Sequence, residues 1–180
     1  MFRRMTLALA ALAALAAAAP AGAQGKVGLG IAANFDSTDA GVSALGVSRI
    51  YVLVPIQLAG NLRIEPMVGM NTVDSAGFDA SDLTLGAGVL FALSASPQAQ
   101  VYAGGRLALD FVSWDDGVAD DSGLDFRIAG AIGGEYFLAP RFSLGAEADF
   151  GFYSTSDGNY TIPDASGFYT AGYFISRFYF

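Results

Sequence analysis

Hydrophobic and polar side chains alternate along most of the chain. Over residues 99–112, for example, Leu107 and Phe111 share one face, and Arg106 and Asp110 share the other. This period of two is typical of β-strands whose two faces meet different surroundings. The pattern predicts eight strands, over residues 25–35, 48–58, 62–71, 82–92, 99–112, 124–137, 142–153 and 167–180.

The charged residues within these strands all lie on the face opposite the aliphatic side chains. They are Lys26, Arg49, Arg63, Glu65, Asp82, Arg106, Asp110, Asp125, Arg127, Glu135, Glu147, Asp149 and Arg177. Bases and acids are nearly balanced, as a desolvated interior requires, because an unpaired buried charge is destabilising. We therefore predict an all-β fold: an eight-stranded antiparallel up-and-down transmembrane β-barrel. Its predicted lumen charge network comprises Arg49, Arg63, Glu65, Arg106, Arg127, Glu135, Glu147, Asp149 and Arg177.

The connections between the predicted strands decide which face points outward. Long connections are expected at 36–46, 72–81, 113–123 and 154–166, and short ones near 59–61, 94–98 and 138–140. Long loops at one end and short turns at the other are typical of outer-membrane barrels, whose apolar face contacts lipid. A secreted soluble ligand-binding barrel, with its apolar face inward, is the alternative.

The first 23 residues are predicted to be a secretory signal peptide. Arg3 and Arg4 form a positive start, residues 7–19 form an apolar run, and small residues at 21–23 offer a cleavage site. The barrel domain is then expected over residues 24–180. Export of this kind places the N-terminus of the barrel in the periplasm, so the first long connection should face out of the cell.

The last predicted strand is aromatic at alternate positions, with Phe174, Phe178 and Phe180 on one face. It resembles the terminal strand that the barrel-assembly machinery reads in bacterial outer-membrane proteins. The predicted barrel as a whole resembles small eight-stranded OmpA/OmpX/OmpW-like barrels of the porin family. This resemblance implies outer-membrane lipids and lipopolysaccharide as surroundings. No peptidoglycan-binding domain follows Phe180, so attachment to the cell wall is not expected.

Composition excludes several classes of function. The chain has no histidine and no cysteine, which removes His-dependent triads, thiolate metal sites and disulfides. Its net charge of −8 argues against nucleic acid as a partner. Glu147 and Asp149 imitate a catalytic carboxylate pair, but an ion-pair network with the predicted lumen arginines explains them better. We expect no catalytic site, no metal and no cofactor.

The predicted long connections are acidic and contain no basic residue. Their densest group is an extracellular acidic cluster formed by Asp115, Asp116, Asp120 and Asp121. A solvated surface that repels its neighbours is the preferred interpretation. Divalent-cation binding that bridges to lipopolysaccharide or to a partner is the alternative.

Together these features predict an outer-membrane barrel with a structural or surface-interaction role through its acidic loops and a lumen plugged by charged residues. A narrow channel, or a transporter of small or hydrophobic solutes, is the alternative within the membrane. A monomer is favoured. Three local features complete the expectation. Asn61 is expected in a left-handed turn, and pairing is expected to be disturbed at Pro55 and Pro66. Aromatic belts at the membrane surfaces are expected to contain Trp114, Tyr136, Phe137, Phe142, Phe150, Phe152, Phe168 and Phe178.

Overall fold

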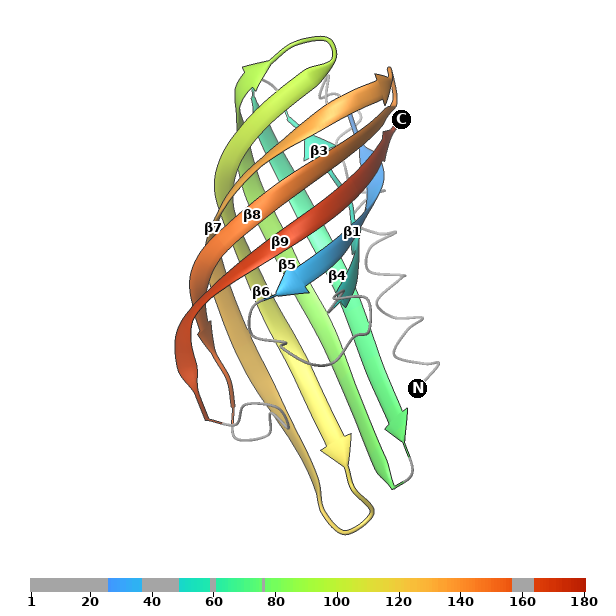
Figure 1. Ribbon diagram of the computed structural model, residues 1–180, viewed down its shortest axis with the longest axis vertical. Coiled ribbons are helices and arrows are strands. Elements are labelled where there is room, and N and C mark those ends of the chain that lie inside the picture. Colours follow the sequence, from blue (N-terminus) through green and yellow to red (C-terminus); the bar gives the residue numbers. More distant parts are fainter. Residues whose placement is uncertain (1–25, 37–48, 59–60, 76, 157–163) are drawn as a thin grey trace.

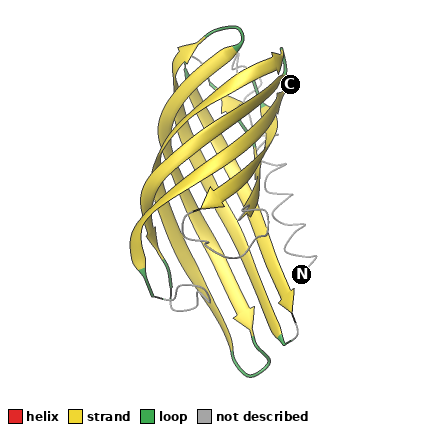
Figure 2. Cartoon of the chain, in the orientation of Figure 1, coloured by secondary structure: helices red, strands yellow, loops and turns green. Residues whose placement is uncertain are grey.

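The computed structural model describes residues 26–36, 49–58, 61–75, 77–156 and 164–180, and the predicted signal peptide lies outside them. These residues form an all-strand molecule (Figures 1 and 2). None of them belongs to a helix long and apolar enough to cross a membrane. The strands are β1 (Gly28–Asp36), β2 (Arg49–Leu53), β3 (Ile56–Gln57), β4 (Leu62–Ser75), β5 (Phe78–Ala95), β6 (Ala99–Asp115), β7 (Asp120–Ala139), β8 (Phe142–Ser154) and β9 (Ser166–Tyr179).

Every strand pairs antiparallel with its neighbours, in the order β2-β1-β9-β8-β7-β6-β5-β4-β3. A further pairing between β2 and β4 joins the two ends of this sheet and closes it into a barrel. β2 and β3 both pair with β4 in a single continuous register, so they are two parts of one barrel strand. The prediction of a closed eight-stranded antiparallel barrel is therefore confirmed.

The break between β2 and β3 arises from two prolines. The amide of Val54 donates to the carbonyl of Pro66 at 2.9 Å, and the amide of Gly28 donates to the carbonyl of Pro55 at 2.9 Å. Neither proline has an N–H to return the bond, so each pair keeps only half of its usual hydrogen bonding. The disturbance is as local as the sequence predicted, because the register on either side is unchanged.

Two of the predicted long connections are wrong. β4 and β5 continue to a tight turn at Gly77, and β6 and β7 leave only residues 116–119 between them. Gly77 and Gly117 supply the positive φ of these turns, at 84° and 79°. The apolar outer stripe stops at 72–81 and 113–123 because outward positions such as Ser81 and Ser113 become polar there, whereas the inward positions Ala80 and Trp114 are hydrophobic. The backbone ladder continues nevertheless. The four strands β4–β7 consequently reach further than the others, at the lower end of Figure 1.

Asn61 does not take the left-handed conformation that the sequence suggested, since Asp164 is the one non-glycine residue with positive φ in the described ranges. The carbonyl of Asn61 accepts from the amide of Ala92 at 2.8 Å, and its Nδ2 donates to the carbonyl of Ala92 at 3.1 Å. Asn61 thus extends the β4–β5 ladder by one residue.

The outer face of the barrel is apolar and the inner face carries the charges. Val89, Leu107 and Ile128 are 45%, 45% and 51% exposed, whereas Glu65 and Arg177 are 0% and 1% exposed. Burial of this kind contradicts the alternative of a soluble barrel with an apolar interior. Twelve of the 13 charged residues placed on the inner face by the sequence are buried or half-buried, and the exception, the exposed Lys26, precedes β1.

The aromatic-belt prediction is wrong for two residues. The Phe137 ring lies 5.9 Å from the ring of Tyr179, which is itself buried in the barrel interior. Trp114 follows the buried Val112 by two positions on β6, so it shares the inner face, and its indole N–H is buried. Both residues were assigned from their closeness to strand ends, which does not distinguish the two faces of a strand.

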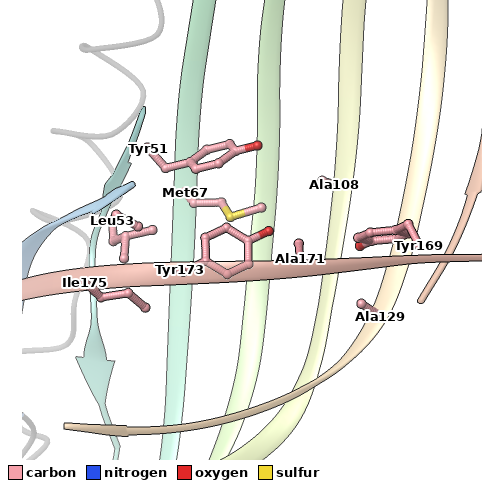
Figure 3. Packing of buried hydrophobic residues seen from close by; sticks show 10 residues of the cluster. Tyr51, Leu53, Met67, Ala108, Ala129, Tyr169, Ala171, Tyr173 and Ile175 are labelled. Carbon is pink, nitrogen blue, oxygen red and sulfur yellow. The ribbon is translucent and has the colours of Figure 1, made fainter. Parts of the chain in front are cut away.

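The middle of the interior is filled by a tyrosine-rich apolar cluster (Figure 3). Tyr51 and Tyr173 face each other with ring centroids 6.1 Å apart. The cluster comprises Ala32, Tyr51, Leu53, Met67, Ala108, Ala129, Tyr169, Ala171, Tyr173 and Ile175. The buried side chains of this cluster come from β1, β2, β4, β6, β7 and β9 and meet inside the barrel.

Gly104→Ala is expected to destabilise the barrel by about 1–3 kcal/mol, the usual range for overpacking. A Cβ at Gly104 would lie 2.0 Å from the carbonyl oxygen of Val89, and backbone atoms cannot move aside. At the adjacent Gly105 the nearest atom, the carbonyl oxygen of Ala129, would lie 3.4 Å away. Urea unfolding in detergent micelles, followed by the gel-mobility difference between folded and boiled protein, measures both variants. Equal losses for Gly104→Ala and Gly105→Ala would contradict this steric explanation.

Candidate functional site

Glu65 on β4 is the centre of a buried ion-pair cluster. Arg177 donates to it from Nε to Oε2 at 2.7 Å and from Nη2 to Oε1 at 3.0 Å. Arg106 Nη2 donates to Oε1 at 2.7 Å, and Arg63 Nε lies 3.8 Å from Oε2. Three guanidinium groups from β4, β6 and β9 thus converge on one fully buried carboxylate.

Glu135 and Glu147 complete this layer. Arg63 Nη1 donates to Glu135 Oε1 at 2.7 Å, and the Ser143 and Tyr179 hydroxyls donate to Glu135 Oε2 at 2.9 and 3.0 Å. Arg106 binds Glu147 through both Nε and Nη2. The layer joins three arginines to three glutamates, so its formal charges cancel. Such cancellation and dense hydrogen bonding are what buried charges require.

Arg63 also stacks on an aromatic ring, with its guanidinium carbon 4.4 Å from the centroid of Tyr102. Arg177 lies 5.6 Å from the same centroid, and its Nη2 is 3.5 Å from the Tyr102 hydroxyl. Tyr102 is almost fully buried. The ring therefore fills the space between two like charges and adds cation–π attraction to each.

A second ionic layer lies nearer the β6–β7 turn, beyond the tyrosine cluster. Asp110 accepts from Arg127 Nε at 2.8 Å and from Arg127 Nη2 and Arg49 Nη1, both at 2.9 Å. Arg49 also pairs with Asp82. Arg127 Nη2 reaches the Tyr51 hydroxyl at 3.2 Å, which ties this layer to the cluster.

Eight of the nine residues in the predicted charge network take part in these two layers. The ninth, Asp149, contacts the first layer through a side-chain hydrogen bond with Glu147 and also hydrogen-bonds with Tyr173. It is 1% exposed, and its Oδ1 has no hydrogen-bond partner within the described part of the chain. The predicted network omitted two charged members of the second layer, Asp82 and Asp110, although the alternation had placed both on the inner face. It also omitted the uncharged members, namely Tyr51, Thr84, Tyr102, Ser143 and Tyr179. Their inward position follows from the same alternation, but a hydroxyl gives no charge signal that would single it out.

The arginines of these layers are held in ion pairs and hydrogen bonds by carboxylates and hydroxyls. No group of three or more acidic side chains among the described residues is arranged to hold a metal ion. The chemistry available inside the barrel is therefore that of charge pairing and hydrogen bonding.

The acidic cluster predicted for a long extracellular loop lies largely on strands, which corrects that prediction. Asp115 ends β6, Asp120 and Asp121 begin β7, and only Asp116 belongs to the turn. The Asp116 carboxylate accepts the amides of Ala119 at 2.7 Å and Val118 at 2.9 Å. These N–H donors lower the pKa of Asp116 below its ordinary value. The strands continue because cross-strand pairing does not require an apolar face.

Two further aspartates join this acidic rim. Asp74 pairs directly with Asp79 across β4 and β5, Asp79 with Asp115 across β5 and β6, and Asp115 with Asp120 across β6 and β7. The result is a straight row of four carboxylates, Asp74, Asp79, Asp115 and Asp120, hereafter the carboxylate row. All four are exposed. The row gives this rim a concentrated negative charge. It also has a cost in stability, because like charges directly opposite each other destabilise a sheet.

The three phenylalanines of the predicted assembly signal lie on the outer face at the end of the chain. Phe174, Phe178 and Phe180 are 67%, 45% and 70% exposed. The rings of Phe178 and Phe180 meet edge to face with centroids 5.6 Å apart. The side chains that the signal requires are therefore accessible from outside the barrel.

The outer face also has the height of a bilayer core. On β5 the outward apolar positions run from Leu83 to Leu93. Ten residues of strand span roughly 34 Å, which a tilt of about 45° reduces to roughly 24 Å. An apolar band of about 25 Å is the value found in outer-membrane barrels.

Comparison with known proteins agrees with this geometry. A family model described as outer membrane protein beta-barrel domain matches residues 5–173. No curated protein matches the chain significantly. Among solved structures, the fold is similar to Neisserial surface protein A (NspA), with a TM-score of 0.56 and 16% identity over 86% of this chain and 95% of that one.

Two other solved structures show the same fold at low identity. Ail, the attachment invasion locus protein of Yersinia pestis, solved with the heparin analogue sucrose octasulfate, gives a TM-score of 0.54 and 10% identity over 86% of this chain and 96% of that one. A major outer membrane protein from Thermus thermophilus gives a TM-score of 0.52 and 14% identity over 87% of this chain and 100% of that one. At these identities the likeness establishes the fold alone.

Proposed function

Since this chain belongs to the outer membrane protein beta-barrel domain family, we propose that it is a closed structural barrel of the outer membrane that makes surface contacts through its acidic rim. The observation that carries this proposal is the pair of ionic layers, with the tyrosine cluster between them. A barrel of eight strands has an interior just wide enough for side chains. Here those side chains are held in place by salt bridges from opposite walls.

The closed lumen is tested by single-channel recording in planar lipid bilayers. We expect no steady conductance from the wild-type protein, because an ion would have to separate Arg106 and Arg177 from Glu65. The heat-modifiable gel mobility of the same preparation shows that the protein under test is folded. Steady conductance of folded wild-type protein would contradict a plugged lumen.

A narrow ion path is the second candidate, and a specific observation favours it. Several buried polar atoms of the interior have no partner among the described residues, among them Asp149 Oδ1, Arg106 Nη1 and Arg63 Nη2. Buried groups of this kind are normally satisfied by water. Brief current steps that are present in wild-type protein and altered in Asp149→Asn would favour this candidate over the closed barrel.

The acidic rim is the proposed contacting surface. If residues 1–23 direct export as expected, β1 starts in the periplasm, and the β4–β5 and β6–β7 turns face out of the cell. The carboxylate row then projects from the cell surface, together with Asp116 and Asp121. Its concentrated negative charge favours basic partner surfaces through long-range attraction.

Binding of poly-lysine to the barrel in nanodiscs tests this role. We expect salt-dependent binding that weakens strongly in the variant with Asp74, Asp79, Asp115 and Asp120 all changed to asparagine. A matched control changes the same four residues to glutamate, which keeps the negative charge, and it should bind poly-lysine as wild type does. If the asparagine variant binds poly-lysine as wild type does, the row is not the contacting surface.

The remaining expectations become parts of the same proposal. Lipids of the outer membrane contact the apolar face, and the barrel-assembly machinery reads Phe174, Phe178 and Phe180 during insertion. We propose that no cofactor is bound inside the barrel, because the described interior contains clusters of its own side chains. We also propose that the barrel is a monomer. The fixed ion pairs give no support for a catalytic role.

A further inference from the structure

The outer face of β4–β7 changes its chemistry in three straight rows. Strand register places the residues of each row directly opposite one another. The apolar row is Met70, Leu83, Phe111 and Leu124; the hydroxyl row is Thr72, Ser81, Ser113 and Ser122; the carboxylate row follows it. Each row lies two residues beyond the last on every strand, so all twelve side chains point outward. The change from hydrocarbon to hydroxyl to charge therefore occurs at one height across four strands.

The apolar row is the last row of the lipid-facing belt. Met70, Phe111 and Leu124 are 41%, 44% and 52% exposed. The hydroxyl row is continuous with this belt, and within it Ser81 Oγ and Ser113 Oγ lie 2.8 Å apart. Ser81 and Ser113 thus share one hydrogen bond, and the remaining hydroxyl donors of the row need partners that hydrocarbon chains cannot supply. The hydrocarbon must therefore end between Leu83 and Ser81 on β5.

We propose that the hydroxyl row binds the polar headgroups of the outer-leaflet lipids, donating hydrogen bonds to their phosphate and ester oxygens. This inference rests on the proposed location in the outer membrane and adds the part of the surface that fixes the barrel's depth. Phosphate contacts are usually made by arginine or lysine, but the sequence has no basic residue between Arg63 and Arg106 or between Arg106 and Arg127. Hydroxyls are the donors that this part of the outer face offers.

The carboxylate row limits the depth from the other side. Two residues of strand span about 7 Å, which corresponds to about 5 Å of depth at a tilt of 45°. The carboxylates thus stand one row beyond the headgroup contacts, in water. Anionic headgroups repel them, so a deeper position of the barrel is unfavourable, and a shallower one exposes Leu83 and Phe111 to water. The three rows together define a single favourable depth.

Depth measurement with nitroxide labels tests the inference, and the natural absence of cysteine allows single labels without other changes. The labelled variants are Leu83→Cys, Ser81→Cys and Asp79→Cys on β5, in vesicles of phosphatidylethanolamine and phosphatidylglycerol. We expect the label at 83 to be relaxed by oxygen, the label at 79 by a water-soluble nickel chelate, and the label at 81 to be intermediate. A label at 79 that is relaxed mainly by oxygen, or one at 83 relaxed mainly by nickel, would overturn the inference.

A label at Val89→Cys distinguishes failure of the depth inference from failure of the proposed outer-membrane location. Val89 lies on the outer face of β5, six residues deeper than Leu83. A label at 89 that is accessible to nickel would show that the barrel is not in the bilayer at all, and the proposed function would fail with it. A lipid-exposed label at 89 with a boundary away from Ser81 would overturn the depth inference alone.

A second variant set tests the hydrogen bonds themselves. Changing Ser81 and Ser113 to valine extends the apolar belt by half a row without altering charge. We expect the label at 79 to lose accessibility to nickel by a factor of about two or more, because the headgroups move toward the carboxylates. An unchanged accessibility would show that the hydroxyl row does not hold the headgroups.

Discussion

Glu65→Gln is expected to lower the free energy of unfolding by about 3–5 kcal/mol, the range measured when one member of a buried ion pair is removed. Glu65 is fully buried and neutralises parts of three arginines, Arg63, Arg106 and Arg177. Glutamine keeps the shape but loses the charge, and its amide N–H groups cannot accept from guanidinium donors. Urea unfolding in micelles, followed by tyrosine fluorescence and gel mobility, measures the effect.

Glu147→Gln provides the matched control for the Glu65→Gln variant. Glu147 is also buried, but the arginine that it pairs with, Arg106, keeps its contact with Glu65 in this variant. Asp149 also stands two residues away on the same face of β8. We therefore expect a clearly smaller loss of stability than for Glu65→Gln. Equal losses would show that burial of a carboxylate, rather than its position between three arginines, determines the effect.

The barrel could be predicted from the sequence because the two faces of each strand lie in different surroundings. Lipid selects apolar side chains outside and a desolvated interior selects paired charges, so alternation persists through residues such as Leu107 and Arg106. At the rim this contrast disappears. Ser81 and Asp82 are both polar although they face opposite ways, and the strand continues without a periodic signal. The lengths of β4–β7 could therefore not be read from the alternation.

Most of the charged residues that form the ionic layers could be predicted, but the pairs that they form could not. Charge and face identified Arg177 and Glu65, which are 112 positions apart in sequence and 2.7 Å apart in space. Which arginine meets which carboxylate depends on barrel tilt and on strand register across the lumen, and neither is set by local pattern. Asp149 shows the limit: its type and face match Glu147, yet it lies beside the tyrosine cluster, and its Oδ1 lacks a partner among the described residues.

The rows of the outer rim emerge only from register. Asp74, Asp79, Asp115 and Asp120 occupy unrelated places in the sequence. The turns at Gly77 and Gly117 set the first and last pairs of the row, and the β5–β6 register sets the pair Asp79 and Asp115. A change of one residue in either turn length would put one residue of each row on the opposite face from the other three. The positions of these turn glycines therefore determine the surface chemistry of the rim.

An arginine placed at two heights on the outer face of β6 tests whether this face contacts hydrocarbon and where the hydrocarbon ends. Leu107→Arg puts a guanidinium at the middle of the apolar belt and is expected to cost about 2–4 kcal/mol, whereas Ser113→Arg on the same face of β6 should cost about 1 kcal/mol or less. Leu107 is 45% exposed, and Ser113 lies in the hydroxyl row. Reversible unfolding in lipid vesicles measures both.

The inner face of β6 offers no equivalent control in this barrel. Ala108 is 4% exposed and packs in the tyrosine cluster, so Ala108→Arg would overpack the interior and does not report orientation. Ser113→Arg avoids this problem because it keeps the same strand and the same outward direction. If Leu107→Arg and Ser113→Arg lost equal stability, the outer face at Leu107 would not contact hydrocarbon. A large loss at Leu107 alone means that hydrocarbon contacts this face at mid-height and ends before Ser113.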